Sequence, residues 1–298
     1  MMRMLRRSDR TVMRMYGRDP LKMIQGLATN DIASAAVGHS VYTAFLTPKG
    51  RMVGDARVLR RANGDVLIEA DRAAADNIAA NFKKFVPPLF ARFERLEAVA
   101  LLEISGDNAA RFCAEVTHLA LLSNPFRPDA LTVLINAEEV ADTEAAAVAM
   151  GAVRSDFETL EVMRIEAGEP KWGAELNEAV IPLEAGLRNV AISETKGCYT
   201  GQEVIVRILH RGHVNRSLRG IMTGAVEVPA AGAELVRASD SKVVGTITST
   251  CYSPALEQAI ALAYVRREIE PPATVQLAEQ DVHVVALPFT AAAQGAQR

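Results

Sequence analysis

Hydrophobic positions follow two different spacings in the first part of the chain. Short apolar or alternating runs bounded by turn residues predict strands at residues 11–16, 41–46, 52–59, 66–70 and 96–104. Apolar residues at helical spacing predict helices at residues 21–25, 72–85, 107–116, 144–150 and 158–167. Because strands and helices alternate and several strand pairs are joined as hairpins, we expect α+β lobes with antiparallel sheets.

From Leu218 onward the pattern changes to short strands separated by turns. Five strands are expected, at residues 218–223, 234–238, 243–250, 260–266 and 275–287, with glycine, proline and serine between them. Short strands with such punctuation predict a small β-barrel at the end of the chain.

One stretch concentrates more chemistry than any other, the octet Lys196-Gly197-Cys198-Tyr199-Thr200-Gly201-Gln202-Glu203. It combines an amine, a thiol, a phenol, an amide and a carboxylate with two glycines that allow tight turns. We therefore expect a functional loop. The β-branched run that follows, residues 204–209, predicts a strand or a short buried element.

The overall charge gives little guidance about partners. The 298 residues include 33 basic and 36 acidic side chains, for a net charge of −3, so nothing global suggests direct binding to nucleic acid or to a membrane. Locally, residues 204–226 contain four arginines and no acid, and Arg207 lies nearest the octet. This basic strip could bind an anionic partner. The alternative is that it is simply a basic face in contact with solvent.

The three cysteines, Cys113, Cys198 and Cys251, lie far apart and show no metal-binding spacing. This pattern argues against a disulfide framework or a metal site and fits the reducing cytoplasm. No apolar run reaches the ~20 residues of a membrane span. The arginine-rich start, residues 1–15, faintly resembles an organellar presequence, but we favour a ragged cytosolic N-terminus that leads into the first strand.

Four stretches resemble one known family. The octet is similar to the signature of the YgfZ-type folate-binding proteins, which are relatives of the glycine-cleavage T-protein (aminomethyltransferase). Residues 17–31, 164–170 and 182–187 resemble further family patterns and occur in the same order, although Ile24 replaces the usual Phe or Leu. The resemblance covers residues 17 to about 265.

The resemblance implies a three-domain ring around a tetrahydrofolate pocket. Residues 1–214 would form two interleaved α+β lobes, with the second lobe at roughly residues 47–115, and residues 215–298 would form the barrel. In relatives, a glutamate in the 164–170 pattern binds the pterin ring and an aromatic residue lines the same pocket. Those positions are Glu166 and Trp172 here. Alternatively, Glu166 pairs with an arginine and Trp172 only fills a core.

Further contacts to folate are expected from the same resemblance. Glu184 either braces the site or caps the next turn, and Tyr199 belongs to the same expected binding set. Arg207 is close enough in sequence to the octet to reach the glutamate tail of a folate.

Cys198 is the residue expected to carry the chemistry, together with Lys196, Gln202 and Glu203. Lys196 can lower the pKa of the thiol, and Gly197 leaves the sulfur accessible. The roles open to Cys198 are thiol redox chemistry, temporary ligation or repair of an iron-sulfur cluster, and simple packing. A cluster needs about four ligands, so it would be shared with a partner.

We therefore expect a tetrahydrofolate-binding protein that supports assembly or repair of iron-sulfur enzymes, including tRNA-modifying ones. Its partners would be those enzymes or cluster carriers. The alternative is a folate-dependent aminomethyltransferase or demethylase. Aminomethyltransferases carry two acids, one of them catalytic, where this chain has Gly54-Asp55. Asp55 is either a lone acid beside the site or, more commonly, a solvated aspartate at a strand end.

Overall fold

The structure is a computed structural model, and it describes residues 1–289. The end of the predicted barrel domain, residues 290–298, lies outside the described part. The chain divides into two compact units. Unit 1 contains residues 1–156, 177–182 and 187–207, and unit 2 contains residues 157–176, 183–186 and the chain from residue 208 onward.

The first sheet of unit 1 has the order β3-β4-β5-β2-β6, and all neighbouring strands are antiparallel. Its strands are β2 (Arg10–Gly17), β3 (Ser40–Leu46), β4 (Met52–Arg60), β5 (Val66–Asp71) and β6 (Ala91–Arg95). Helix α2 (Arg72–Phe85) covers one face. Asp71 caps this helix by accepting a hydrogen bond from the backbone N–H of Ala73 at 2.8 Å.

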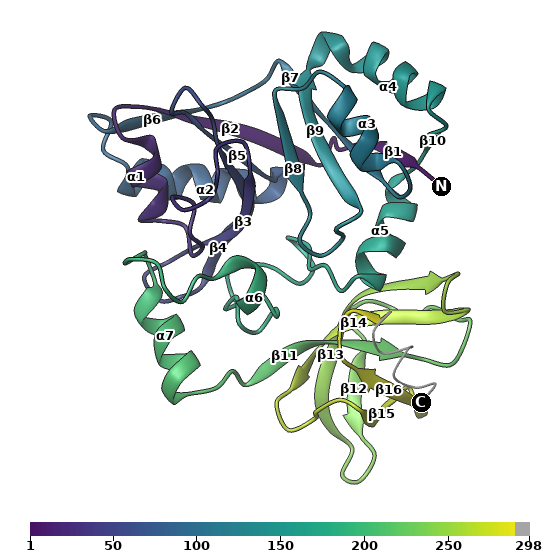
Figure 1. Cartoon of the computed structure of the whole chain (residues 1–298). Helices are drawn as coiled ribbons and strands as arrows, with labels where there is room; N and C mark the ends of the chain where they lie inside the picture. The colour runs from purple at the N-terminus through teal and green to yellow at the C-terminus, as the bar shows by residue number, and fades with distance from the viewer. Residues whose placement is uncertain (290–298) are drawn as a thin grey trace. The chain divides into compact units, whose positions relative to one another are not determined.

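The second sheet of unit 1 has the order β10-β1-β7-β9-β8. Its strands are β1 (Arg3–Arg6), β7 (Val99–Ser105), β8 (Ala120–Ser123), β9 (Ala130–Asn136) and β10 (Val153–Arg154). Helices α3 (Ala109–Glu115) and α4 (Val140–Ala149) share a core with it (Figure 1). Strand β1 belongs to this sheet, strands β2 to β6 form the other sheet, and strands β7 to β10 belong to this sheet again. The two lobes are therefore interleaved in sequence.

The two sheets of unit 1 are joined by an apolar cluster and by buried ion pairs. The cluster takes Val12, Leu59 and Leu67 from the first sheet and Leu101, Leu122 and Leu134 from the second. Nearby, Arg57 donates to Glu69 at 2.7 Å and to the Thr132 hydroxyl at 3.1 Å. Glu103 accepts from Arg127 at 2.7 Å. Removing one member of such a pair is costly, because it leaves the other buried without a partner.

Unit 2 is built on a closed six-stranded barrel with the order β11-β14-β13-β12-β15-β16. Its strands are β11 (Arg216–Met222), β12 (Glu234–Arg237), β13 (Lys242–Ser253), β14 (Gln258–Arg266), β15 (Ala273–Leu277) and β16 (Gln280–Val285). Helix α5 (Phe157–Glu166) packs on β13 and β14. The α+β class and the terminal barrel are therefore confirmed.

A 3-10 helix at Ala137–Glu139 precedes α4, and three further α-helices lie between or after the strands of unit 1 in the sequence. They are α1 (Pro20–Gln25) and α6 (Arg188–Ala191) in unit 1, and α7 (Gln202–Arg211), which begins in unit 1 and continues into unit 2. The predicted strand or buried element at residues 204–209 is wrong, because these residues lie within α7. Ile205, Ile208 and Leu209 have helical spacing and are the more covered side chains. This amphipathic pattern outweighs the β-propensity of the run.

Two other predictions of local structure are also wrong. The single strand at residues 275–287 is a hairpin of β15 and β16. The two turn residues, Ala278 and Glu279, have positive φ of 48° and 69°. Such turns usually contain glycine or asparagine, and the sequence has neither here, so nothing in it indicated the turn. The N-terminus is not ragged, because β1 pairs with β7 and β10, and Met2 and Met4 are buried.

Candidate functional site

The octet 196–203 is tied to unit 1 through the side chain of Lys196. Its Nζ donates to the carbonyl oxygens of Gln25 at 2.6 Å, Ala28 at 2.6 Å and Asn30 at 3.1 Å. An ammonium group has three donors, so all of them are used. The acceptors lie at and just beyond the end of α1, where free carbonyls favour a cation.

Burial lowers the pKa of Lys196 to about 8, against the opposing effect of Asp31. The amine is therefore mostly charged at neutral pH. Its Nζ also lies 5.3 Å from the centre of the Tyr199 ring, at cation–π distance. Because the donors of Nζ are all engaged with carbonyls, none is left to hydrogen-bond a Cys198 thiolate. The geometry favours an anchoring role for Lys196.

The end of the octet lies directly on the hairpin turn at residues 47–50. Gly201 has φ +84°, and a Cβ atom there would lie 2.6 Å from the carbonyl oxygen of Thr47. Within that turn, Gly50 has φ +72°, and a Cβ atom there would lie 2.9 Å from Val204 in α7. Glycine is therefore needed on both sides of this contact.

Cys198 is the exposed cysteine of the three. The preceding Gly197 has open space around it, because a Cβ atom added there would meet no atom within 4 Å apart from its chain neighbours. Burial raises the pKa of Cys113 to about 11 and that of Cys251 to about 12, with Glu166 adding to the second shift. Chemistry that needs an accessible thiol is therefore available to Cys198 and not to the other two.

The neighbouring Tyr199 is mostly covered. Only 7% of it is exposed, and burial, with a contribution from Glu194, raises its pKa to about 12. The phenol therefore stays protonated over the physiological range. Because the ring is covered and lies against the Nζ atom of Lys196, Tyr199 stabilises the octet and has little surface left for a ligand.

Helix α7 carries the remaining predicted residues of unit 1. Gln202 and Glu203 form its first turn, where the carboxylate of Glu203 suits the positive end of the helix dipole. Arg207 is exposed and makes no hydrogen bond or ion pair with residues 1–289. Its guanidinium is free to bind an anion.

Glu166 and Trp172 lie in unit 2, at and beyond the end of α5. Glu166 accepts a hydrogen bond from the Ser253 hydroxyl at 2.5 Å. Within the described chain it forms no ion pair with an arginine, which was the alternative expectation. Its second carboxylate oxygen accepts nothing from the described residues, so it can accept from a ligand. Trp172 is 9% exposed, so its side chain is almost completely buried.

A buried polar cluster beside these residues was not predicted. Arg164 contacts the Glu175 carboxylate at 3.2 Å and donates to the Ser249 hydroxyl at 2.6 Å. Ser249 and Thr248 each donate to Glu175 at 2.6 Å, and the Tyr264 hydroxyl donates to the Glu175 carbonyl at 2.8 Å. These bonds fix the end of α5 against β13. The feature of the sequence that could have indicated this cluster is Arg164, the arginine of the 164–170 pattern.

Glu184 pairs with Arg216 at 3.3 Å, and its backbone carbonyl accepts from the N–H of Leu218 at 2.8 Å. The guanidinium of Arg216 lies 4.4 Å from the centre of the Tyr264 ring. Glu184 therefore holds its segment against the start of β11.

Asp55 is not the solvated strand-end residue that is more common at such positions. It lies within β4 and is 5% exposed, and one carboxylate oxygen accepts from the Tyr42 hydroxyl at 3.0 Å while the other has no partner among the described residues. Burial raises its pKa, against the opposing charge of Arg10. At Gly54 a Cβ atom would lie 2.8 Å from the Ile78 side chain of α2, so a second acid would fit there only if Ile78 moved.

The predicted residues thus form two groups. Lys196, Cys198 and Tyr199, with Gln202, Glu203 and Arg207, belong to unit 1, whereas Glu166, Trp172 and Glu184 belong to unit 2. Within the part of the chain that the structure describes, no three His, Cys, Asp or Glu side chains are grouped to hold a metal ion. Across residues 1–289, no helix is both long and apolar enough to cross a membrane.

Comparisons with known proteins agree with this architecture. The family model of the GCVT N-terminal domain matches residues 8–128, and that of the glycine cleavage T-protein C-terminal barrel domain matches residues 216–290. The aminomethyltransferase T of the glycine cleavage system from Bartonella henselae has a similar structure, with a TM-score of 0.83 and 18% identity over 97% of this chain and 86% of that one. At this identity the likeness shows the fold.

Curated relatives are more similar in sequence. The tRNA-modifying protein YgfZ of Yersinia pestis (strain Pestoides F) is 31% identical over an alignment of 241 positions, gaps included, that covers 76% of this chain and 73% of the relative. YgfZ of Yersinia enterocolitica is 31% identical over an alignment of 248 positions with the same coverage. The chain therefore belongs to the YgfZ family, with the fold of the glycine-cleavage T-protein.

Proposed function

We propose that this protein binds tetrahydrofolate and supports the assembly or repair of iron-sulfur enzymes, including tRNA-modifying ones, through the thiol of Cys198. The observation that carries this proposal is an exposed cysteine in a firmly anchored loop. Lys196, Tyr199 and Gly201 hold the octet in place, and Cys198 between them remains accessible. A reactive group is used most effectively when its support is rigid.

As a thiolate, Cys198 can ligate one iron atom after its proton passes to solvent. An iron-sulfur cluster usually takes about four protein thiolates. The remaining ligands would come from a client enzyme or a cluster carrier, which makes an iron-sulfur protein the expected partner. We expect this chemistry in the cytoplasm, where thiols are kept reduced. The name of the curated YgfZ relatives, tRNA-modifying protein, supports the choice of clients.

The chemistry of individual described residues supports the proposal of a folate. The free carboxylate oxygen of Glu166 can accept from the pterin amino edge, and the hydrogen bond from Ser253 holds the carboxylate in place. In unit 2, Trp172 would supply an apolar surface and Glu184 a brace. In unit 1, Arg207 would supply a cation for the glutamate tail, and Tyr199 would support the octet. When bound, tetrahydrofolate supplies a carrier for one-carbon groups.

The test uses a host that lacks its own YgfZ protein. Wild-type protein should restore the activity of iron-sulfur enzymes that modify tRNA, and Cys198→Ala should fail to restore it at equal abundance. Cys251→Ser provides a matched control, because Cys251 is buried and is not proposed to react. Full restoration by Cys198→Ala would refute the role of the thiol.

Asp55 favours a second candidate function, folate-dependent aminomethyl transfer or demethylation. A buried acid with a raised pKa and one unpaired oxygen is a typical proton-transfer group. The packing of Ile78 against Gly54 speaks against it, because relatives carry a second acid there. Formation of methylene-tetrahydrofolate from an N-methyl or aminomethyl substrate, abolished in Asp55→Asn, would establish this alternative.

A further inference from the structure

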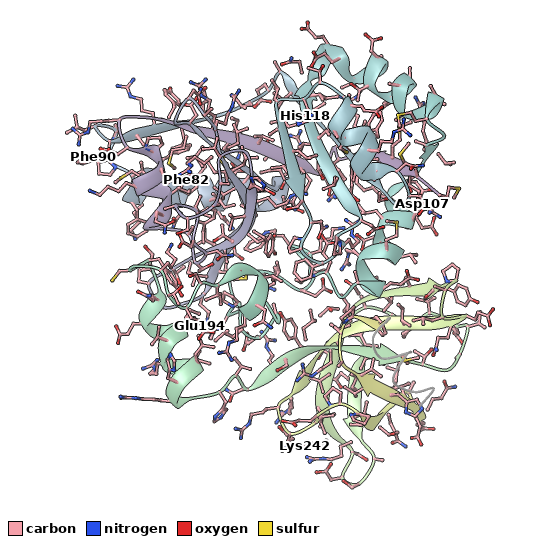
Figure 2. The ribbon with its side chains drawn as sticks, in the orientation of Figure 1. Phe82, Phe90, Asp107, His118, Glu194 and Lys242 are labelled. Atoms are coloured by element: carbon pink, nitrogen blue, oxygen red, sulfur yellow. The ribbon has the colours of Figure 1, made fainter. Side chains whose placement is uncertain are left out.

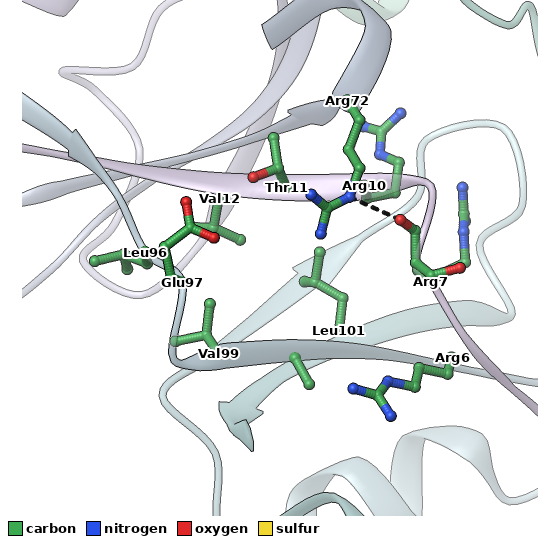
Figure 3. Close-up of a pocket in the computed structure, with 12 residues that line it drawn as sticks. Arg6, Arg7, Arg10, Thr11, Val12, Arg72, Leu96, Glu97, Val99 and Leu101 are labelled. Carbon is green, nitrogen blue, oxygen red and sulfur yellow. Dashed lines mark hydrogen bonds between the residues drawn. The ribbon is translucent and has the colours of Figure 1, made fainter. Parts of the chain in front are cut away.

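A small polar cavity lies in unit 1, away from the octet, where the turn between β1 and β2 meets the residues that lead into β7. Its volume is about 100 Å³, and four arginines line it, namely Arg6, Arg7, Arg10 and Arg72 (Figure 3). Glu97 is the acidic residue of the lining. Four guanidinium groups around one small space are unusual in a chain whose net charge is −3.

Two of the arginines, Arg7 and Arg10, form ion pairs with buried carboxylates that fix their positions. Arg10 binds both oxygens of Glu69, which is 1% exposed, through its Nε and Nη2 atoms. Arg7 binds Asp9 through Nε and Nη2, and Glu103 through Nη1. The Nη1 atom of Arg10 donates to none of the described residues, and Figure 3 shows this guanidinium turned toward the middle of the cavity. It is a fixed donor without an acceptor.

The other two arginines supply cations that the described chain does not neutralise. Arg72 is anchored only through Nε, which donates to the carbonyl of Ser8 at 2.8 Å, so both Nη atoms remain available. Arg6 is exposed and forms no ion pair within residues 1–289. Arg72 is also the first residue of the 14-residue helix α2, whose N-terminus is already capped by the carboxylate of Asp71. The dipole of this helix therefore adds little to the attraction for an anion.

The carboxylates do not remove the attraction for an anion. The oxygens of Glu69, Glu103 and Asp9 are engaged with guanidinium groups, which fixes the arginines in position. Glu97 faces Arg10 in Figure 3 but forms no ion pair with it. Glu97 therefore does not neutralise Arg10, and its negative charge should repel an anion that enters the cavity.

We propose that this cavity binds a phosphate group. A volume of about 100 Å³ is too small for a folate or a whole nucleotide, since pockets for such ligands measure roughly 300–1,000 Å³. A tetrahedral oxyanion fits this volume and matches the forked donors of arginine. The phosphate is either free in solution or belongs to a larger ligand that extends outside the cavity. The proposal is independent of the role of Cys198.

The test is calorimetric titration of the full chain with inorganic phosphate and, separately, with adenosine monophosphate. Binding of phosphate alone would identify a free anion, and binding of both would identify a phosphate group on a larger ligand. Arg6→Ala and Arg72→Ala should each weaken binding about tenfold, the usual worth of a charge-assisted hydrogen bond. Glu97→Gln should strengthen binding, because it removes the repulsion.

The control is Arg267→Ala, which removes the same charge from an exposed position in unit 2. It should leave the affinity unchanged, and circular dichroism should show that every variant is folded. The proposal is overturned if neither compound binds at millimolar concentration. It is also overturned if Arg72→Ala binds as tightly as the wild type, or if Arg267→Ala weakens binding as much as Arg72→Ala does.

Discussion

Gly201 and Thr47 are in such close contact that a side chain at position 201 would begin 2.6 Å from the Thr47 carbonyl oxygen. The contact joins the end of the octet to the β3–β4 turn, two segments far apart in sequence. The contact fixes the start of α7 and holds the octet that carries the exposed Cys198. Figure 2 labels Glu194, which lies just before this octet in the chain.

Gly201→Ala should therefore destabilise unit 1. The cost of a non-glycine residue at φ +84° is about 1–3 kcal/mol, and the overlap with Thr47 adds to it. Urea unfolding measures the change. Gly197→Ala is the matched control, because open space surrounds Gly197 and the substitution should cost less than about 0.5 kcal/mol. Equal losses for the two variants would contradict the contact.

Lys196→Met should lower the free energy of unfolding by about 2–4 kcal/mol, because three carbonyl oxygens lose their donor. Lys171→Met, at an exposed lysine, is the control. If the main role of Lys196 is to activate the thiol, Lys196→Met would instead keep its stability and slow the reaction of Cys198 with a thiol reagent. The two measurements together decide between anchoring and activation.

Acid stability should depend on Glu103. Burial opposes its ionisation, but Arg127 and Arg7 outweigh this effect and lower its pKa to about 2, from 4.5 in the unfolded chain. The stabilisation is therefore complete above pH 4.5 and is lost as the pH falls toward 2. Glu103→Gln should cost about 3–5 kcal/mol at pH 7. The difference from wild type should shrink in acid, and a constant difference would contradict the assignment.

The three cysteines should differ sharply in reactivity. A thiol reagent should modify Cys198 quickly in the native protein, whereas the buried Cys113 and Cys251 should react only on unfolding. The Cys198→Ala variant should then show no fast phase. A fast phase that persists in this variant would mean that one of the buried thiols is accessible.

Much of the fold could be predicted, because local signals and packing agree in most elements. The turn at residues 47–50 and the Asp71 cap place β3, β4 and α2 close to their expected ends. The prediction is wrong where tertiary context decides. The β-branched run of α7 is helical because one face packs, and the β15–β16 turn uses Ala278 and Glu279 at positive φ without a glycine.

The candidate site was less predictable than the fold. The sequence identifies Lys196 and Cys198 as neighbours in an octet, but only the folded chain shows that Lys196 binds the carbonyls of residues 25–30. The burial of Asp55 depends in the same way on packing between distant strands. Long-range contacts of this kind leave no periodic pattern in a single sequence.

Binding of tetrahydrofolate is the most direct test of the proposed folate site. Titration should quench the fluorescence of Trp172, the single tryptophan, in a saturable way after correction for ligand absorption. Glu158→Ala, at an exposed residue of the same helix, should bind as the wild type does, whereas Glu166→Ala should bind at least about tenfold more weakly. Absence of saturable binding at millimolar ligand, or equal affinity of Glu166→Ala and wild type, would contradict the proposed folate site.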